Sequence, residues 1–237
     1  MPTRVSISGK TDPDGKTKDA AEDEFAAFFG SQFELQLQEI TDELNTREPE
    51  LMPNSFWERW GAVFLAFLIP SFTSMALQGA ETQMRVLDIG VDWDFVTTQA
   101  ANFSSTYAFS LVKDLNESAR NHLQTSMTSF FQSPERDVDA LISQIAQRFG
   151  PVRAENIAIT EVTRGFERGK DIYIEELAKI GVKAEQLWHT RLDERVCTIC
   201  EPNEGKFKSE GWTADGIPPH PRCRCWTTLG IVTGETG

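Results

Sequence analysis

The sequence predicts a mainly α-helical protein, in which a helical N-terminal and central body precedes a small α+β C-terminal module with a zinc-knuckle-like loop. Two observations lead to this fold class. Apolar residues recur at helical spacing through most of the chain as far as Ile180, and Gly181 then marks a helix end. Beyond that point, all four cysteines lie between Cys197 and Cys225, flanked by segments rich in strand-forming residues.

The chain of 237 residues is long enough for a sizeable core. We predict four consecutive segments: a flexible N-terminal arm at 1–20, a helical region with a partner interface at 21–90, a helical body at 91–182 and a metal-binding α+β module at 183–237. The arm is polar and rich in turn-forming residues, so we expect it to order on a partner. The first helix is predicted over Glu24–Leu44, and Pro49 closes it off.

The next helix contains an uncharged stretch from Trp60 to Ala80, with a continuous apolar run at Ala62–Ile69. A membrane span needs about 20 predominantly apolar residues. Here Pro70 and several polar residues follow the run, so a buried helix is favoured and no membrane is expected. Large aromatic side chains dominate protein interfaces. The aromatic residues predicted to form the partner interface are Trp57, Trp60, Phe64, Phe67 and Phe72.

Four further helices are predicted in the helical body. The first runs from Val91 to about Leu115, and the second runs from Glu117 to Phe131 with Asn116 as a suitable N-cap. Ser133-Pro134 has the residue types of an N-cap and first helical position. The last helix covers Val152–Ile180, and its polar face carries Glu161 in a predicted surface ion pair with Arg164 or Arg168. Strands are then predicted at 187–192 and 225–232, on either side of the cysteine loop.

The cysteine loop has the ligand spacing of a metal site. Cys197 and Cys200 form a C-x2-C pair, and His220 with Cys223 forms an H-x2-C pair. Two close pairs separated by a loop suit a tetrahedral ion, and thiolate and imidazole donors favour Zn²⁺. We therefore predict a structural zinc held by these four residues, with Cys225 as the alternative fourth ligand. A metal-free thiol cluster, disulfides and redox chemistry remain alternatives.

The net charge of −13 is unevenly distributed along the chain. Residues 183–237 hold seven Lys/Arg and eight Asp/Glu, so −12 of the total belongs to residues 1–182. Such an acidic surface argues against a protein that coats DNA, because neutralising phosphates needs clustered cations. The exception is the metal region, whose basic residues would meet phosphates or an acidic partner. They are Arg191, Arg195, Lys206, Lys208, Arg222 and Arg224.

Two sequence blocks carry a family resemblance. The first runs from Arg153-Ala154-Glu155 through Thr160-Glu161 to Phe166-Glu167-Arg168-Gly169-Lys170. The second comprises Trp188, the segment 193–200, Gly205-Lys206 and the segment 220–225. With these blocks and the helical outline of 95–149, the chain from about Val91 to Val232 resembles the phage Mu F-like family of head morphogenesis proteins. The family usually has Arg before its Thr-Glu pair, where this chain has Ile159.

The resemblance implies a minor head (minor capsid) protein of a tailed phage. Such a protein is a structural virion component, assembled in the bacterial cytoplasm and located at the portal vertex or capsid interior, and acts in head assembly and genome packaging or delivery. Its implied partners are the portal protein and the major capsid or scaffolding protein; weak contact with packaged DNA and self-association are further expectations. The resemblance implies no enzyme activity. The family-motif positions in this chain are Thr160, Glu161, Asp193 and Arg195.

Two other functions remain as alternatives. A zinc-dependent nuclease or other metal enzyme would need a second cluster of His, Asp or Asn to activate water. His122 and His189 stand apart from the cysteine loop in the sequence, so no such cluster is predicted. A membrane-active protein built on residues 60–77 is the third hypothesis.

Overall fold

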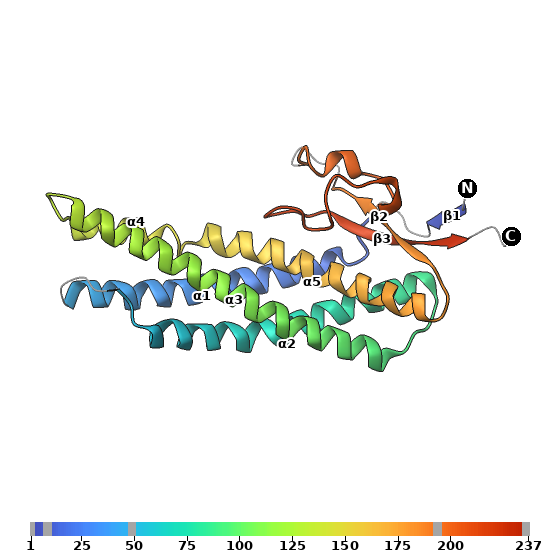
Figure 1. Ribbon diagram of the computed structural model, residues 1–237, viewed down its shortest axis with the longest axis horizontal. Coiled ribbons are helices and arrows are strands. Elements are labelled where there is room, and N and C mark those ends of the chain that lie inside the picture. Colours follow the sequence, from blue (N-terminus) through green and yellow to red (C-terminus); the bar gives the residue numbers. More distant parts are fainter. Residues whose placement is uncertain (1–2, 7–10, 47–50, 192–195, 234–237) are drawn as a thin grey trace. The chain divides into compact units, whose positions relative to one another are not determined.

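The computed structural model describes residues 3–6, 11–46, 51–191 and 196–233 and confirms the predicted fold class. These ranges contain five α-helices, and Figure 1 labels each of them. Their bounds are α1 Gly15–Thr46, α2 Asn54–Leu87, α3 Trp93–Gln132, α4 Val138–Ala146 and α5 Pro151–Lys179. Two short 3₁₀ helices, Glu201–Asn203 and Lys208–Glu210, lie in the cysteine loop.

The chain divides into two compact units, each discontinuous in sequence. Unit 1 comprises 1–22, 71–103 and 159–237, and unit 2 comprises 23–70 and 104–158. The structural units therefore differ from the four consecutive segments predicted above, because each long helix contributes one part of its length to one unit and the rest to the other. The cysteine loop belongs to unit 1 together with the first turns of α1 and most of α5.

A three-stranded antiparallel sheet lies in unit 1, with strand order β1-β3-β2 (Figure 1). Strands β2 (Ala184–His189) and β3 (Trp226–Thr233) were predicted, and they pair in the register Ala184↔Ile231 to His189↔Trp226. Strand β1 (Thr3–Ser6) pairs with the other edge of β3 and was not predicted. The cysteine loop is thus the connection between two neighbouring strands, which holds its two ends together.

The prediction of a flexible arm at 1–20 was wrong for the residues that the structure describes. Besides β1, the turn at Asp12–Gly15 leads directly into α1, where the backbone N–H of Lys18 donates to the Asp14 carbonyl. Asp14 and Lys18 are both buried. Charged side chains this deeply buried are nearly always paired, and each of these has partners of opposite charge within unit 1. The polar composition of the segment reflects ion pairing rather than disorder.

Two predicted helix boundaries in the central region were also wrong. Helix α3 is continuous through Asn116, whose side chain does not cap a helix but donates to the backbone carbonyl of Trp57. Helix α4 begins after Asp137 rather than at Pro134, because the Asp137 carboxylate accepts from the backbone N–H groups of Asp139 and Ala140. In both places a polar side chain had more than one available backbone partner, and sequence alone did not distinguish them.

Close packing of α2 on α5 forms the centre of unit 1. Gly79 on α2 faces the backbone of Phe166, and Gly169 on α5 faces the backbone of Ala76. A Cβ atom at either glycine would overlap a carbonyl oxygen of the opposite helix. The core around this crossing also includes Leu229 of β3, so the sheet packs on the same helices.

Aromatic rings fill the core of unit 2. Phe64 on α2 contacts Phe28, Phe29 and Phe33 on α1, with ring centroids 5.5–6.2 Å apart. Phe67 stacks on Phe28 at 3.8 Å. The predicted partner interface was therefore wrong: Trp57, Trp60, Phe64 and Phe72 are buried within their own units and Phe67 is partly buried. Phe64 and Phe67 pack on an aromatic face of α1, whereas Phe72 packs on Phe103 of α3.

Among the described helices, α2 has the length and apolar composition needed to cross a membrane. Core helices of soluble proteins meet the same criterion, so this is weak support for the membrane hypothesis. The aromatic face of α2 is already packed against other helices of each unit.

Replacement of the core residue Phe64 by Asp should unfold unit 2. The Phe64 side chain is 1% exposed, so the variant would bury a carboxylate among rings and lose about 3 kcal/mol or more. The matched control is Phe109→Asp, because Phe109 on α3 is 60% exposed and surface changes usually stay within about 0.5 kcal/mol. Thermal unfolding compares the two; equal stabilities would contradict the assignment of Phe64 to the core.

Candidate metal centre

The five predicted ligands meet in one cluster between β2 and β3. Cys200, Cys223 and Cys225 are buried together with Trp188, while Cys197 and His220 are partly exposed. The cysteines form no disulfide. A cavity of about 50 Å³ lies at the cluster. The five donors line it with Arg191, Val196, Arg222 and Arg224.

Two triads of donor atoms share Cys200. One triad is Cys197, Cys200 and His220, and the other is Cys200, Cys223 and Cys225; within each, the donor atoms lie within 4.8 Å of one another. His220 Nε2 is 3.0 Å from Cys197 Sγ and 3.3 Å from Cys200 Sγ. Cys200 Sγ is 3.8 Å from Cys223 Sγ. Cys200 is therefore the central donor, and the geometry leaves Cys223 and Cys225 as equivalent candidates for a fourth position.

The contacts of the His220 ring fit the tautomer that coordination through Nε2 requires. Its Nδ1 lies 2.8 Å from the carbonyl oxygen of Pro221. A carbonyl oxygen only accepts, so Nδ1 carries the proton and donates. In the neutral ring, Nε2 then has its lone pair free, and that atom faces the two thiols. This is the outer hydrogen bond that orients metal-binding histidines.

The buried thiols differ in their tendency to ionise. A hydrogen bond from Cys225 lowers the pKa of Cys223 to about 7. The same hydrogen bond raises the pKa of Cys225, and burial raises the pKa of Cys200, with the nearby Cys223 adding to it. Among the three buried thiols, Cys223 thus forms the thiolate most readily, and the thiolate is the metal-binding form of cysteine.

Short backbone turns position the donors. At the first pair, the N–H groups of Cys200 and Glu201 both donate to the Cys197 carbonyl, at 3.0 and 2.9 Å. At the second pair, the N–H of Cys223 donates to the His220 carbonyl at 3.3 Å, and Arg222 has a φ of +63°. Each turn brings its two donors to the same side of the chain.

Helix α5 forms hydrogen bonds with the turn that contains His220 and Cys223. The Thr160 hydroxyl accepts from the backbone N–H of Arg222 at 3.0 Å, and the Thr163 hydroxyl donates to the Cys223 carbonyl at 3.1 Å. The family-motif residue Thr160 therefore contacts the ligand turn. The predicted ion pair of Glu161 with Arg164 is present. Its predicted place on the surface was wrong for Glu161, which is buried. Asp193 and Arg195 lie outside the described residues.

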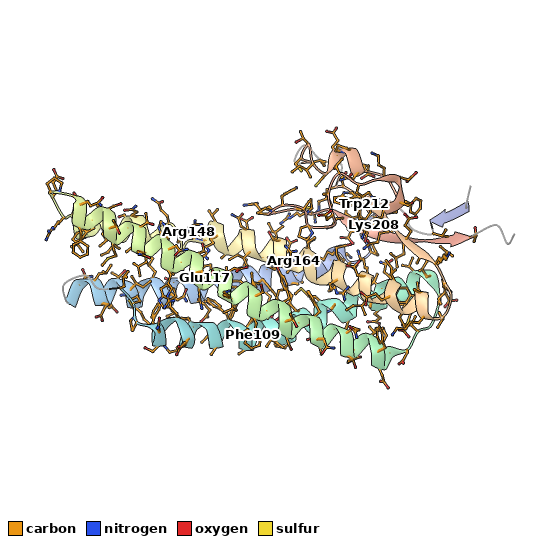
Figure 2. The ribbon with its side chains drawn as sticks, in the orientation of Figure 1. Phe109, Glu117, Arg148, Arg164, Lys208 and Trp212 are labelled. Carbon is orange, nitrogen blue, oxygen red and sulfur yellow. The ribbon has the colours of Figure 1, made fainter. Side chains whose placement is uncertain are left out.

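The rest of the loop folds around a buried amide. Asn203 accepts the backbone N–H of Thr213 at 2.8 Å and donates to the Ile199 carbonyl at 3.0 Å. Trp212 packs edge-on against Trp188, with ring centroids 4.9 Å apart. Lys208 lies 5.8 Å from the Trp212 ring centre (Figure 2). This small core is mostly aromatic rings and thiols, so a bound metal would contribute much of its stability.

The remaining two histidines do not join the cluster. His189 is buried, stacks on Trp226 and bonds the Thr228 hydroxyl at 2.8 Å. His122 contacts the Gln144 carbonyl in unit 2. Within the described residues, no second group of metal-type ligands accompanies the cluster.

The residues that anchor the ligand turn and β3 were not predicted as site residues from the sequence. Thr163 was not singled out, and Glu167 and Lys170 were named only as part of a resemblance block, without a role beside the cluster. The signal was present: Thr163, Glu167 and Lys170 recur at helical spacing within the apolar stripe of α5. Polar residues in such a stripe indicate buried polar partners.

Comparisons of the chain with protein-family models, with curated proteins and with solved structures give no match.

Proposed function

We propose that the cluster binds one Zn²⁺ ion as a structural centre. The main support is that two tight turns bring the cysteine thiols and the His220 imidazole together. The lone pair of His220 Nε2 is directed at the thiols. In a tetrahedral site with Zn–S bonds of about 2.3 Å, two sulfurs lie roughly 3.8 Å apart. The Cys200–Cys223 separation is 3.8 Å. The proposed ligands are Cys197, Cys200, His220 and Cys223, the last because His220 and Cys223 have the shorter pair spacing, and Cys225 is the alternative fourth ligand.

The proposed role of the zinc is structural, not catalytic: it stabilises the loop between β2 and β3. Four protein donors fill a tetrahedral ion and leave no position for a substrate water, as is usual for structural zinc sites. The ion would join the turn after β2 to the turn before β3, and α5 holds the latter through Thr160 and Thr163. Metal binding therefore fixes the loop between the two strands against α5.

For the whole chain, we propose a minor head protein of a tailed phage. The support is the resemblance of two sequence blocks to the phage Mu F-like family. Those blocks lie far apart in sequence but contact each other in unit 1, where Thr160 of the first bonds Arg222 of the second. Contact between the two blocks gives a physical reason for their joint occurrence. The proposed location is the portal vertex or capsid interior, and the proposed partner is the portal protein, with capsid or scaffolding protein as further contacts.

Copurification with portal rings tests this proposal. The chain is co-expressed with the portal protein of the same phage, and portal rings are isolated by size. We expect the chain to remain with the rings at low salt; because its net charge is −13, contacts made by its acidic surface should weaken as the salt concentration is raised. The control is a portal protein from an unrelated phage. A folded chain that associates with neither portal rings nor capsid shells would contradict the proposal.

A further inference from the structure

A network of buried charges joins the start of α1 to α5. Lys170 on α5 is fully buried, 2.7 Å from Glu167 and 3.6 Å from Asp14. Lys18 on α1 lies 3.0 Å from Asp12 and 3.5 Å from Glu167. Two lysines and three carboxylates thus hold residues 12–18 against α5. All five side chains belong to unit 1.

The same network bonds the strand that leaves the metal cluster. Glu167 accepts from both the backbone N–H and the hydroxyl of Thr227, at 3.2 and 2.6 Å. The Lys170 ammonium donates to the Thr227 carbonyl at 2.8 Å. Thr227 follows Cys225 by two positions, so the backbone that presents the second ligand pair also satisfies the charges that dock the N-terminal segment.

A second set of contacts joins α1 to the rim of the metal cavity. Arg224 lies between Cys223 and Cys225 and donates to Glu22 at 2.7 Å. Arg191, at the end of the chain segment that follows β2, pairs with Asp19 at 3.3 Å. Both arginines line the cavity at the cluster. The segment 11–22 therefore has polar contacts with both sides of the metal loop.

Because the charges between residues 12–18 and α5 are buried, this contact depends on the position of Thr227 on β3. Burial alone would lower the pKa of Lys170, but Glu167, Asp14 and Asp12 outweigh it and keep the ammonium protonated. Removing one partner of a buried pair leaves an uncompensated charge and is strongly destabilising. A small displacement of β3 from α5 would have this effect, because Thr227 would withdraw its three hydrogen bonds from Glu167 and Lys170.

We propose that metal binding at the cluster and docking of residues 11–22 are thermodynamically coupled, so that the metal centre locks the N-terminal segment onto α5. The inference rests on the metal centre proposed above. Bound zinc fixes segment 220–225 and thereby the positions of Arg224 and of Thr227, which follows it. Arg224 pairs with Glu22 of the N-terminal segment. Thr227 forms hydrogen bonds with Lys170 and Glu167 of the buried network. Coupling between two binding events is reciprocal. Release of the N-terminal segment therefore weakens zinc binding, and loss of zinc frees the segment.

Hydrogen exchange on the unaltered full chain is the first test. Amide exchange is compared in the zinc-loaded chain and after removal of zinc by a chelator. We expect the amides of residues 15–22 to exchange at least about tenfold faster without zinc, in line with coupling energies that commonly give 5–150-fold effects. The amides of α1 in unit 2, at residues 30–44, serve as the internal control and should not change. Equal exchange of residues 15–22 in both states would overturn the coupling.

The second test measures zinc affinity by competition with a chromogenic chelator. Lys18→Gln removes a cation from the buried network and should weaken zinc binding about tenfold, within the usual range of coupling. Lys16→Gln is the matched control, because Lys16 is exposed and lies one residue from the network's turn. Equal affinities for the two variants would overturn the coupling while leaving the metal centre intact. A wild-type chain that binds no zinc would overturn the centre and the coupling together.

Discussion

Gly169→Ala should destabilise unit 1 by about 3 kcal/mol, the upper end of typical overpacking costs. The added Cβ would overlap the Ala76 carbonyl oxygen and lie 2.9 Å from the Ala80 nitrogen. Both are backbone atoms, so no side chain can rotate away and α2 must separate from α5. A loss of this size lowers the melting temperature by roughly 6–12 °C for a chain of this length. Thermal unfolding followed by circular dichroism measures it.

Gly30→Ala is the control for that experiment. Gly30 lies within α1, and a Cβ atom added there would meet no neighbouring side chain or helix within 4 Å, so the new methyl group has space. Alanine is favoured over glycine inside a helix by about 0.5–1 kcal/mol, and this variant should be slightly more stable than the wild type. If Gly169→Ala matched Gly30→Ala in stability, the close contact of α2 with α5 would be refuted.

Cys200→Ala should abolish zinc binding and unfold the loop between β2 and β3. Cys200 is the donor shared by both triads, so neither triad survives its loss. Structural zinc contributes about 10–16 kcal/mol of binding energy in small zinc-dependent folds, and the core around Trp188 and Trp212 is too small to replace it. The near-ultraviolet circular dichroism of this tryptophan pair should disappear. The helical signal should remain, because α1 to α5 have their own apolar cores.

Comparison of Cys223→Ala with Cys225→Ala identifies the fourth ligand. Cys223→Ala should lose zinc nearly as completely as Cys200→Ala, and Cys225→Ala should retain it with reduced affinity. Chelators should remove zinc more easily as the pH falls, because protons compete with the metal for thiolates and imidazole. Zinc retention by Cys223→Ala and loss by Cys225→Ala would assign the fourth position to Cys225.

Those features that depend on local spacing were predictable from the sequence. The apolar stripe of α5, its end at Gly181 and the two ligand pairs each rest on intervals of a few residues. In the structure Gly181 has a φ of +80°, and the N–H of Val182 donates back to the Leu177 carbonyl at 2.9 Å, as expected for a helix end of this kind. The five metal donors also come together as their spacing indicated.

Features that depend on distant partners were not predictable in this way. Phe64 has the same composition cues whether it meets a partner protein or α1, and only the fold shows that Phe28 and Phe29 face it. Asp14 and Lys18 belong to a polar, turn-forming segment of the sequence, but their partners Lys170 and Glu167 lie about 150 residues further along the chain. The residues of a buried ion network do not recur at a fixed interval in the sequence. The polar composition of residues 11–20 therefore led to the prediction of a flexible arm.

Measuring the zinc content of the purified chain tests whether the cysteine and histidine cluster is a zinc centre. The full-length protein is prepared under reducing conditions without added chelator, and metal is measured by elemental analysis alongside titration of the accessible thiols. We expect about one zinc per chain, with the ligand thiols protected until a chelator removes the metal. A chain with no bound metal and four freely reacting thiols would contradict it.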